Sequence, residues 1–257
     1  MQILLTNDDG IFAPGLAAIY KELTRLGNVL VVAPASSKSG ASHSVTFHEP
    51  LVCNKVEIEG AFSGFSVEGS PADCVKLAFM QLCPQKPDLL VAGINAGANA
   101  GINVYYSGTV AAAMEGAFLN IPAVALSLDR DEPMNFETAA KYCLDIIRKL
   151  LPVKSGAVYN INIPKLSKGK PKGVKVVTQA NEGFEEYYIR QTNDLGQTVF
   201  QLAGSLDHTE SESAENTDTN SLAAGFITIT ALNPDMTEHE KTGQLNKIFD
   251  SNFTLFL

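Results

Sequence analysis

Residues 1–34 read MQILLTNDDGIFAPGLAAIYKELTRLGNVLVVAP, and this stretch decides the fold class. The apolar run at residues 3–6 predicts a short buried strand, and Pro14 begins a helical pattern that continues to about Leu26. Gly27 ends that helix, and residues 29–33 form a second apolar run. A strand, a helix and a second strand in this order predict the start of a parallel α/β sheet.

The same alternation continues to residue 164. Further helices are predicted at residues 70–82, 108–119 and 136–151, and further buried strands at residues 88–93, 122–128 and 158–163. The short, partly alternating segments between residues 45 and 67 are typical of an antiparallel edge or hairpin. We therefore expect an α/β catalytic core at residues 1–164, with a mostly parallel sheet flanked by helices.

The pattern changes in residues 165–257. We expect a hairpin at 184–203, a mobile acidic loop at 210–220, a strand at 226–231 and a short helix at 238–248. Apolar side chains in the hairpin and tail either cover a partner or pack on the chain's own core, and the sequence leaves both open. They are Phe184, Tyr187, Tyr188, Phe200, Phe249, Phe253, Leu255, Phe256 and Leu257.

The composition excludes several classes of partner. The formal net charge is −9, which disfavours nucleic-acid polymers and anionic membranes, although a bound metal can still attract a small anion. The four cysteines lack metal-site or disulfide-like spacing, which favours a reducing compartment. Since we also find no signal segment and no membrane-spanning run, we expect a cytoplasmic protein.

Two adjacent carboxylates, Asp8 and Asp9, follow the first predicted strand. Ligands of open parallel sheets bind at the carboxyl ends of the strands, and carboxylates this close need an offsetting charge such as a divalent cation. Asp9-Gly10 is also a strong turn signal. The next predicted element is a helix and not a returning strand, which favours a metal-binding or catalytic role.

Polar loops follow the next two strands. Residues 36–44 are rich in serine and contain His43, which is either an acid–base group or an ordinary solvated histidine. Residues 93–101 carry Asn95 and Asn99 but match no dinucleotide or P-loop pattern. Ser107, Gly108 and Thr109 begin the following helix, where they form an N-cap, a phosphate site or both. Together these groups fit metal-assisted attack on a phosphate ester better than acyl transfer.

Several blocks carry a resemblance to a known family. They are ILLTNDDGIFAPGL (3–16), VVAPASSKSGASHSVT (31–46), GSPADCVKLA (69–78), PDLLVAGINAGANAG (87–101), YSGTVAAAMEGAFLNIPAVALSL (106–128), YNINIP (159–164) and GFITITALNPDMT (225–237). In this order they resemble the SurE (survival protein E) family of 5'/3'-nucleotidases. The likeness covers nearly the whole chain.

The resemblance implies a metal site and a substrate. Asp8, Asp9, Ser39 and Asn95 match the family positions that hold one divalent cation per subunit, Mg or Mn. Asn99 and Ser107 match positions near the substrate phosphate, with Gly108 and Thr109 beside them. The substrates expected are nucleoside 5'- or 3'-monophosphates and short polyphosphate.

The resemblance also implies an architecture and an assembly. The family fold is a Rossmann-like core with a projecting C-terminal hairpin and an exchanged arm, so residues 165–257 would form a hairpin and an oligomerisation arm returning to the core. Family members are homodimers or homotetramers.

Three departures from the family pattern concern substrate preference. Residues 35–38 read ASSK where the family has Asp-Arg-x-Arg, so a basic contact is weakened or replaced by Lys38. His43 stands where Asn is common, and Ala98 replaces a Pro. None of these removes an expected metal ligand.

The mechanism we expect is metal-assisted hydrolysis of a phosphomonoester. Asp8 and Asp9 are the expected catalytic residues, with Asp9 favoured as general base and a direct Asp nucleophile as the alternative. Two rival functions are a transferase that uses nucleotide sugars and a non-catalytic, metal-dependent nucleotide-binding protein.

Overall fold

The computed structural model describes residues 1–58, 60–181, 186–204 and 216–249. A nine-stranded sheet in the order β3-β4-β2-β1-β5-β6-β7-β11-β8 forms the centre of the molecule. Its strands are β1 (Gln2–Thr6), β2 (Asn28–Pro34), β3 (Cys53–Ile58), β4 (Phe62–Val67), β5 (Leu89–Ala96), β6 (Ala123–Leu128), β7 (Val158–Ile163), β8 (Val174–Val176) and β11 (Ile227–Leu232). Neighbours from β4 to β7 are parallel, while β3 against β4 and β11 against β7 are antiparallel. The expected α/β class is confirmed.

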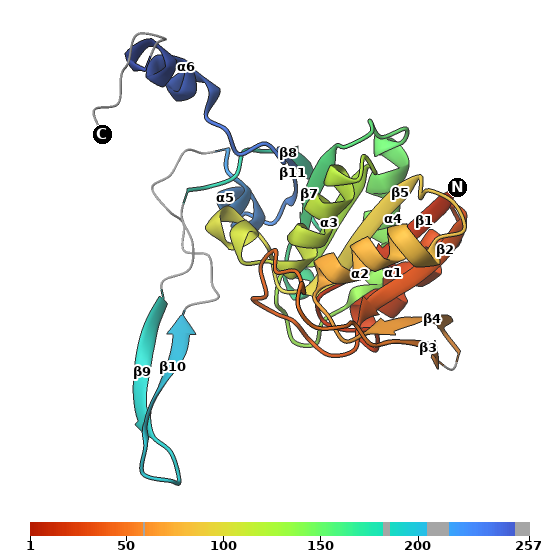
Figure 1. The fold of residues 1–257 in the computed structure, drawn as a ribbon, viewed down its shortest axis with the longest axis horizontal. Coiled ribbons are helices and arrows are strands. Elements are labelled where there is room, and N and C mark those ends of the chain that lie inside the picture. The colour runs from red at the N-terminus through yellow and green to blue at the C-terminus, as the bar shows by residue number, and fades with distance from the viewer. Residues whose placement is uncertain (59, 182–185, 205–215, 250–257) are drawn as a thin grey trace.

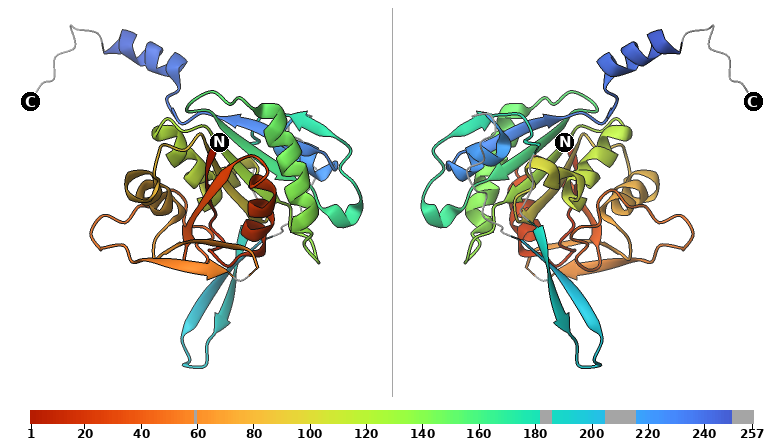
Figure 2. Two further views of the ribbon diagram at one scale, coloured as in Figure 1. Left: turned by 90° about the vertical axis from the view of Figure 1, so that its right-hand side faces the viewer. Right: turned by 90° about the vertical axis from the view of Figure 1, so that its left-hand side faces the viewer.

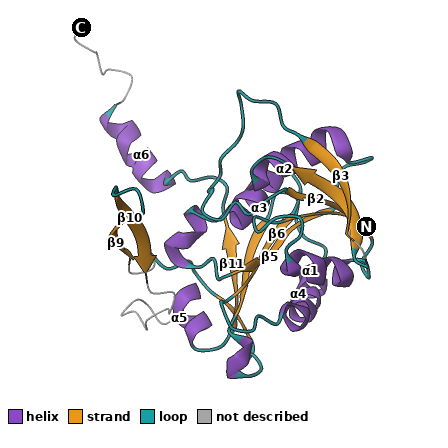
Figure 3. Cartoon of the chain, turned by 90° about the horizontal axis from the view of Figure 1, so that it is seen from below, coloured by secondary structure: helices purple, strands orange, loops and turns teal. Residues whose placement is uncertain are grey.

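Helices cover both faces of this sheet (Figure 3). α1 (Pro14–Leu23) and α4 (Phe136–Leu150) lie on one face, and α2 (Pro71–Leu77) and α3 (Gly108–Phe118) lie on the other. Side chains of a strand alternate between the faces, so Leu5 packs with the α1–α4 layer and Leu4 with the α2–α3 layer. This arrangement leaves only the strand ends and their loops for polar chemistry.

The C-terminal part adds two strands to the sheet and one separate hairpin. β9 (Glu186–Thr192) and β10 (Thr198–Gly204) pair only with each other among the described strands, and they project from the body of the molecule (Figures 1 and 2). The hairpin prediction is therefore confirmed. The shorter elements are the π-helical turn η1 (Ala78–Leu82), the 3-10 turns η2 (Gly101–Tyr105) and η3 (Leu166–Lys168), α5 (Asp218–Ala223) and α6 (His239–Ile248).

The hairpin leaves its aromatic side chains exposed. Tyr187, Tyr188 and Phe200 are all at least 60% exposed, so they do not pack on the core of this chain. Phe184 and the expected apolar tail at residues 253–257 lie outside the described residues. No helix in the described ranges combines the length and the apolar character needed to cross a membrane.

The acidic segment differs from the sequence expectation. Residues 210–215 lie outside the described part, but Thr217 bridges to Thr178 and Asp218 begins α5. Asp218 is fully buried and accepts hydrogen bonds from the backbone N–H groups of Gly101 and Ala180, both at 2.9 Å. The prediction of a mobile loop is wrong for residues 216–220, because composition does not reveal that this carboxylate has buried backbone donors to satisfy.

Two helices end earlier than the sequence predicted. α1 ends at Leu23 and not near Leu26, because the N–H groups of Arg25 and Leu26 bond three residues back and tighten the chain into a turn. α2 gives way to the π-helical turn η1 after Leu77, within the single helix expected at residues 70–82. Neither shift moves a residue of the expected site.

Candidate active site

Residues Asn7 to Gly10 form a closed turn at the end of β1. The Asn7 amide donates to the Gly10 carbonyl at 2.9 Å and accepts from the Gly10 N–H at 3.2 Å. Gly10 has a φ of 104°, which residues with a side chain rarely adopt. The turn signal in the sequence is therefore real. It leads into α1 and leaves Asp8 and Asp9 at the carboxyl edge of the sheet.

The Asp8 side chain is buried against the first turn of α3. Its residue is 3% exposed, and its Oδ1 accepts a 2.5 Å hydrogen bond from the Thr109 hydroxyl. Burial raises the pKa of Asp8, the bond from Thr109 opposes that rise, and the charge of Asp9 adds to it. A carboxylate in this position gains from a nearby positive charge.

Asp9 borders a different cavity from Asp8. Its Oδ2 accepts a 2.9 Å hydrogen bond from the Ala96 N–H at the end of β5. Burial raises the pKa of Asp9, while the Ala96 bond and the charge of Arg130 act in the opposite direction. Asp9 lines a cavity of about 350 Å³ that also includes Phe12 and Phe136.

A pocket of about 580 Å³ lies at the carboxyl edge of the sheet. The expected site residues among those that line it are Asp8, Ser39, Asn95, Asn99 and Ser107. The structure thus brings together residues from the three loops that the sequence placed at strand ends and from the start of α3. Asp9, Gly108 and Thr109 do not belong to the described lining, although Ala96 borders both this pocket and the cavity of Asp9.

Asn95 and Asn99 are held in fixed orientations. The Asn95 amide nitrogen donates to the Gly97 carbonyl at 2.8 Å, which leaves the amide oxygen as the atom that can coordinate or accept. Asn99 is buried, and its amide nitrogen donates to the Ser127 hydroxyl at 2.9 Å. Such fixed amides suit ligand binding because little further ordering is needed.

The N-terminus of α3 comes close to Asp8. Ser107 is the N-cap, with its Oγ accepting from the Val110 N–H at 3.1 Å. A Cβ built on Gly108 would lie 2.8 Å from the Asp8 Cβ, so only glycine permits this approach. Thr109 is fully buried, and its hydroxyl contacts Asp8 instead of the pocket. The sequence expected Thr109 beside the phosphate, and the structure places its side chain behind the carboxylate.

The donor set suits a hard divalent cation. Asp8, Ser39 and Asn95 offer carboxylate, hydroxyl and amide oxygens to one pocket, and Asp9 is near enough to Asp8 to raise its pKa. Magnesium and manganese prefer oxygen ligands of this kind. Across the described residues, no group of three or more His, Cys, Asp or Glu side chains is placed to hold a metal ion, so this donor set depends on the Ser39 hydroxyl and the Asn95 amide.

The sequence missed the residues that hold Asn99. Its backbone carbonyl accepts from the amide nitrogens of Asn160 at 2.7 Å and Asn162 at 3.1 Å, and its N–H donates to the Asn162 oxygen at 2.8 Å. Both asparagines are fully buried on β7. Two polar residues inside the otherwise apolar run at residues 158–163 were the signal that could have revealed them.

The sequence analysis also did not identify Arg130, a positively charged residue of the pocket lining. Arg130, two residues after β6, lines the pocket, whereas Lys38 is not part of its described lining. The charge of Lys38 acts instead on the buried Cys74 thiol. The expectation that Lys38 replaces the family's basic contact is not supported by this lining, which contains Arg130 instead.

A mostly parallel sheet with a polar pocket at its carboxyl edge defines a Rossmann-like α/β protein with a candidate ligand site. The model of the family "Survival protein SurE" matches residues 3–186, and the chain belongs to this family. Two similar proteins are both named 5'-nucleotidase SurE. The one from Christiangramia forsetii is 40% identical over 92% of this chain and 92% of its own length. The one from Rhodopirellula baltica is 40% identical over 95% of this chain and 97% of its own length. The crystal structure of the SurE protein from Aquifex aeolicus superposes with a TM-score of 0.82 at 37% identity, covering 97% of this chain and 100% of that one.

Proposed function

We propose that this chain is a metal-dependent 5'-nucleotidase that hydrolyses nucleoside monophosphates to nucleoside and phosphate. The observation that carries the proposal is the pocket in which Asp8, Asn95 and Ser107 lie together at the start of α3. Carboxylates for a cation and a helix N-terminus for an anion meet in one place. The names of the similar proteins point to the same activity.

The metal ligands of this proposal are Asp8, Asp9, Ser39 and Asn95. A divalent cation bound there would polarise the phosphoryl group and neutralise part of its charge. Thr109 holds one Asp8 oxygen at 2.5 Å, and Ala96 holds one Asp9 oxygen at 2.9 Å. Each carboxylate is therefore oriented by a donor on one oxygen, and we assign the other oxygen to coordination.

The phosphate contacts of this proposal come from the start of α3 and from the loop after β5. The Ser107 hydroxyl and the Asn99 side chain line the pocket at the start of α3, where the helix dipole favours negative charge, and the Gly108 N–H is the first of that helix. Charge that develops on the phosphoryl oxygens would be stabilised by these fixed donors. Asn160 and Asn162 keep Asn99 in place from β7.

The proton transfer is assigned to Asp9. Water adds to phosphorus, the ester P–O bond breaks, and the proton of the water passes to the carboxylate. The released nucleoside oxygen takes a proton from solvent. Burial raises the pKa of Asp9, which makes its carboxylate a better proton acceptor, while the Ala96 hydrogen bond and the charge of Arg130 oppose that rise.

Arg130 is assigned to the substrate anion. The protein carries a net charge of −9, so an anionic substrate meets a repulsive field outside the pocket. Arg130 is exposed at the pocket rim, where its guanidinium can reach an entering phosphate. A nucleoside 3'-monophosphate or a short polyphosphate would meet the same cation, and we propose both as secondary substrates.

We also propose that the enzyme is a homodimer or homotetramer in the cytoplasm. The support for an oligomer is the hairpin with its exposed Tyr187, Tyr188 and Phe200. The support for a reducing compartment is that Cys53, Cys74, Cys83 and Cys143 are all free. Light scattering of the purified chain tests the first of these statements.

A phosphate-release panel tests the proposed activity. Nucleoside 5'- and 3'-monophosphates and tripolyphosphate are incubated with Mg²⁺, Mn²⁺ or EDTA, without any acceptor substrate. We expect phosphate release from AMP that EDTA abolishes and that the Asp8→Asn variant lacks. Metal-dependent AMP binding without turnover would instead show a nucleotide-binding protein, and hydrolysis retained in Asp8→Asn would overturn the site assignment.

A further inference from the structure

The segment that carries Ser39 has a strained backbone. Ser42 adopts a φ of 53°, a left-handed conformation that serine rarely takes without support from its surroundings. Its hydroxyl donates to the Tyr105 carbonyl at 2.7 Å, and its N–H donates to the Tyr106 carbonyl at 3.1 Å. Residues 38–42 therefore depend on contacts with other parts of the fold to keep their shape.

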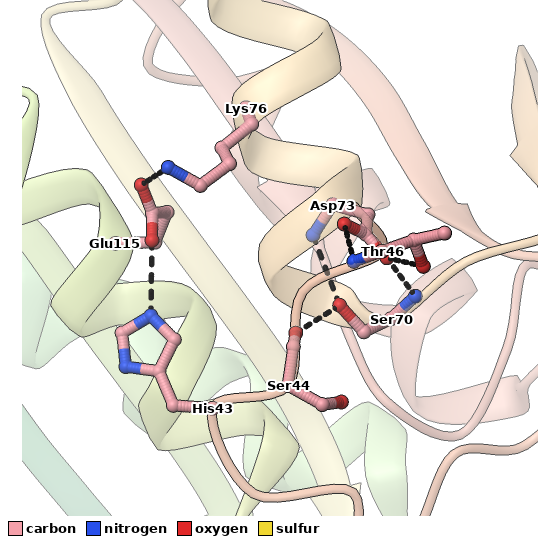
Figure 4. A network of polar contacts seen from close by, with 7 residues as sticks. All are labelled: His43, Ser44, Thr46, Ser70, Asp73, Lys76 and Glu115. Atoms are coloured by element: carbon pink, nitrogen blue, oxygen red, sulfur yellow. Dashed lines mark hydrogen bonds and ion pairs between the residues drawn. The ribbon is translucent and has the colours of Figure 1, made fainter. Parts of the chain in front are cut away.

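His43 supplies one such contact to α3. Its Nε2 lies 3.0 Å from Oε2 of Glu115, a carboxylate whose side chain is only 4% exposed (Figure 4). Lys76 of α2 lies 2.8 Å from the other Glu115 oxygen. Because an ionised carboxylate only accepts, Nε2 must be the protonated nitrogen of the ring. The ring also stacks on Phe118, with centroids 5.6 Å apart and planes at 12°.

Glu115 is ionised in this arrangement. Burial raises its pKa, but the hydrogen bonds from His43 and Lys76 outweigh burial and bring the pKa below the ordinary value. Removing one partner from a buried charge is costly, because the charge remains without full compensation. The contact between His43 and Glu115 is thus one that the fold has reason to keep.

α3 connects this contact to Asp8. Thr109 in its first turn bonds Asp8, and Glu115 lies six residues further along the same helix, about 9 Å at 1.5 Å per residue. At the other end of the segment, the Lys38 N–H donates to the Asp8 carbonyl at 2.7 Å. The segment is therefore held at both ends. Lys38 bonds Asp8, which Thr109 joins to α3, and His43 bonds Glu115 of the same helix. Ser39 lies between these two contacts in the chain.

We propose that His43 is a positioning residue that fixes Ser39 relative to Asp8 through its hydrogen bond to Glu115. Ser39 is a metal ligand only in the proposed function, so this role of His43 rests on that function. A second anchor lies beyond His43, where Ser70 donates to the Ser44 carbonyl at 2.6 Å and Thr46 donates to Asp73 from both its N–H and its hydroxyl (Figure 4). His43 lies between this anchor and Ser42, and it is the side chain that ties the segment to α3.

Two substitutions separate the hydrogen bond from the ring. His43→Phe keeps a ring that can stack on Phe118 but has no donor. His43→Gln loses the ring but keeps an amide nitrogen near the position of Nε2. His43→Ala removes both and serves as a second loss variant if the phenylalanine disturbs folding. Circular dichroism and thermal melts establish that each variant is folded.

The first readout is hydrogen exchange of the whole chain without metal. We expect the amides of Ala41 and Ser42 to exchange faster in His43→Phe and His43→Ala than in wild type, and at the wild-type rate in His43→Gln. The second readout is Mn²⁺ binding, followed by calorimetry. We expect the dissociation constant to rise about tenfold in His43→Phe and to change less than about twofold in His43→Gln.

The outcomes distinguish this role from the proposed function. Unchanged exchange in His43→Phe would overturn the positioning role, and so would a His43→Gln variant that behaves like His43→Phe. Faster exchange with unchanged Mn²⁺ affinity would show that Ser39 needs no such support. Absence of Mn²⁺ binding to wild type would overturn the metal site itself, and the exchange rates would still decide whether His43 holds the segment.

Discussion

The Thr109 hydroxyl donates a 2.5 Å hydrogen bond to Oδ1 of Asp8, and this bond joins the first turn of α3 to the end of β1. The two residues are 101 positions apart in the chain. Gly108 allows the helix to approach, Ser107 caps it, and Thr109 makes the contact. The carboxylate that we assign to the metal is therefore oriented by the same helix that we assign to the phosphate.

Replacing Thr109 by valine tests this bond. The shape is kept while the hydroxyl is lost, so a buried acceptor loses its donor. We expect the free energy of unfolding to fall by about 1–3 kcal/mol. We expect kcat/KM for AMP to fall about ten- to a hundredfold, because Asp8 is no longer held in place. Thr138, in the first turn of α4 and outside the pocket lining, is the matched control. Equal losses in Thr138→Val would contradict the specific role of Thr109.

A pair of charge-removing substitutions tests which basic side chain, Arg130 or Lys38, contacts the phosphate of the substrate. Arg130→Gln is expected to raise the KM for AMP about tenfold, since a hydrogen bond to a charged group contributes about 1.5 kcal/mol. Lys38→Gln removes the same charge from a side chain outside the described pocket lining, and its KM is expected to stay within about twofold of wild type. Steady-state kinetics at low and high salt measure both. A larger rise in KM for Lys38→Gln than for Arg130→Gln would show that Lys38 makes the contact with the phosphate.

The hydrogen bonds by which β7 holds the Asn99 backbone are tested by replacing Asn162. Asn162→Ala removes both hydrogen bonds between the Asn162 side chain and the Asn99 backbone. We expect kcat/KM for AMP to fall about tenfold or more, because each buried group left without a partner costs about 1–3 kcal/mol. Asn54→Ala on the exposed edge strand β3 is the control. Wild-type kinetics in Asn162→Ala would show that these two hydrogen bonds do not position Asn99 for catalysis.

Acid sensitivity is expected from Asp73, which caps α2. Burial raises its pKa, but hydrogen bonds from Thr46 and Ser70 outweigh burial and leave the pKa below the ordinary value. A depressed folded-state pKa contributes stability above the unfolded pKa, and that contribution is lost as the pH falls through the folded pKa. The wild type should therefore lose stability below about pH 4.

Denaturant titrations from pH 7 to pH 3 measure this effect. Asp73→Asn is expected to be less stable than wild type by about 1–3 kcal/mol at pH 7, and the difference should shrink as the pH falls. Glu68→Gln removes an exposed carboxylate nearby and should follow the wild-type pH profile. A constant difference between wild type and Asp73→Asn at all pH values would contradict the depressed pKa.

The sequence predicted which residues lie at the strand ends, but it did not predict the long-range hydrogen bonds that hold those residues in place. The loops that carry Asp8, Asn95 and Asn99 could be placed together because parallel strands end at one edge of a sheet, and Ser107 begins the helix that follows. Ser39 was singled out within its serine-rich loop only by the family resemblance. Periodicity and motif spacing report on such regular features. They also predicted the hairpin, whose two strands are neighbours in the sequence.

The supporting residues depend on distant contacts that no local pattern records. His43 and Glu115 are 72 positions apart, and Gly101 and Asp218 are 117 positions apart. Asn160 and Asn162 sit inside a strand that otherwise looks apolar, and their partner is in a loop that precedes them by about 60 residues. The absence of Lys38 from the described pocket lining, and the presence of Arg130 in it, has no local signal either. These features require the folded structure.

Gly108 has a consequence for attempts to make this protein more heat-resistant. Replacing glycine by alanine inside helices is a common route to stability, since it reduces the freedom of the unfolded chain. At Gly108 the added methyl group would lie 2.8 Å from the Asp8 Cβ and 3.0 Å from the Pro71 ring. A consensus or helix-propensity design that includes this position would push α3 away from β1. The exchange that strengthens other helices would here separate the two walls of the pocket.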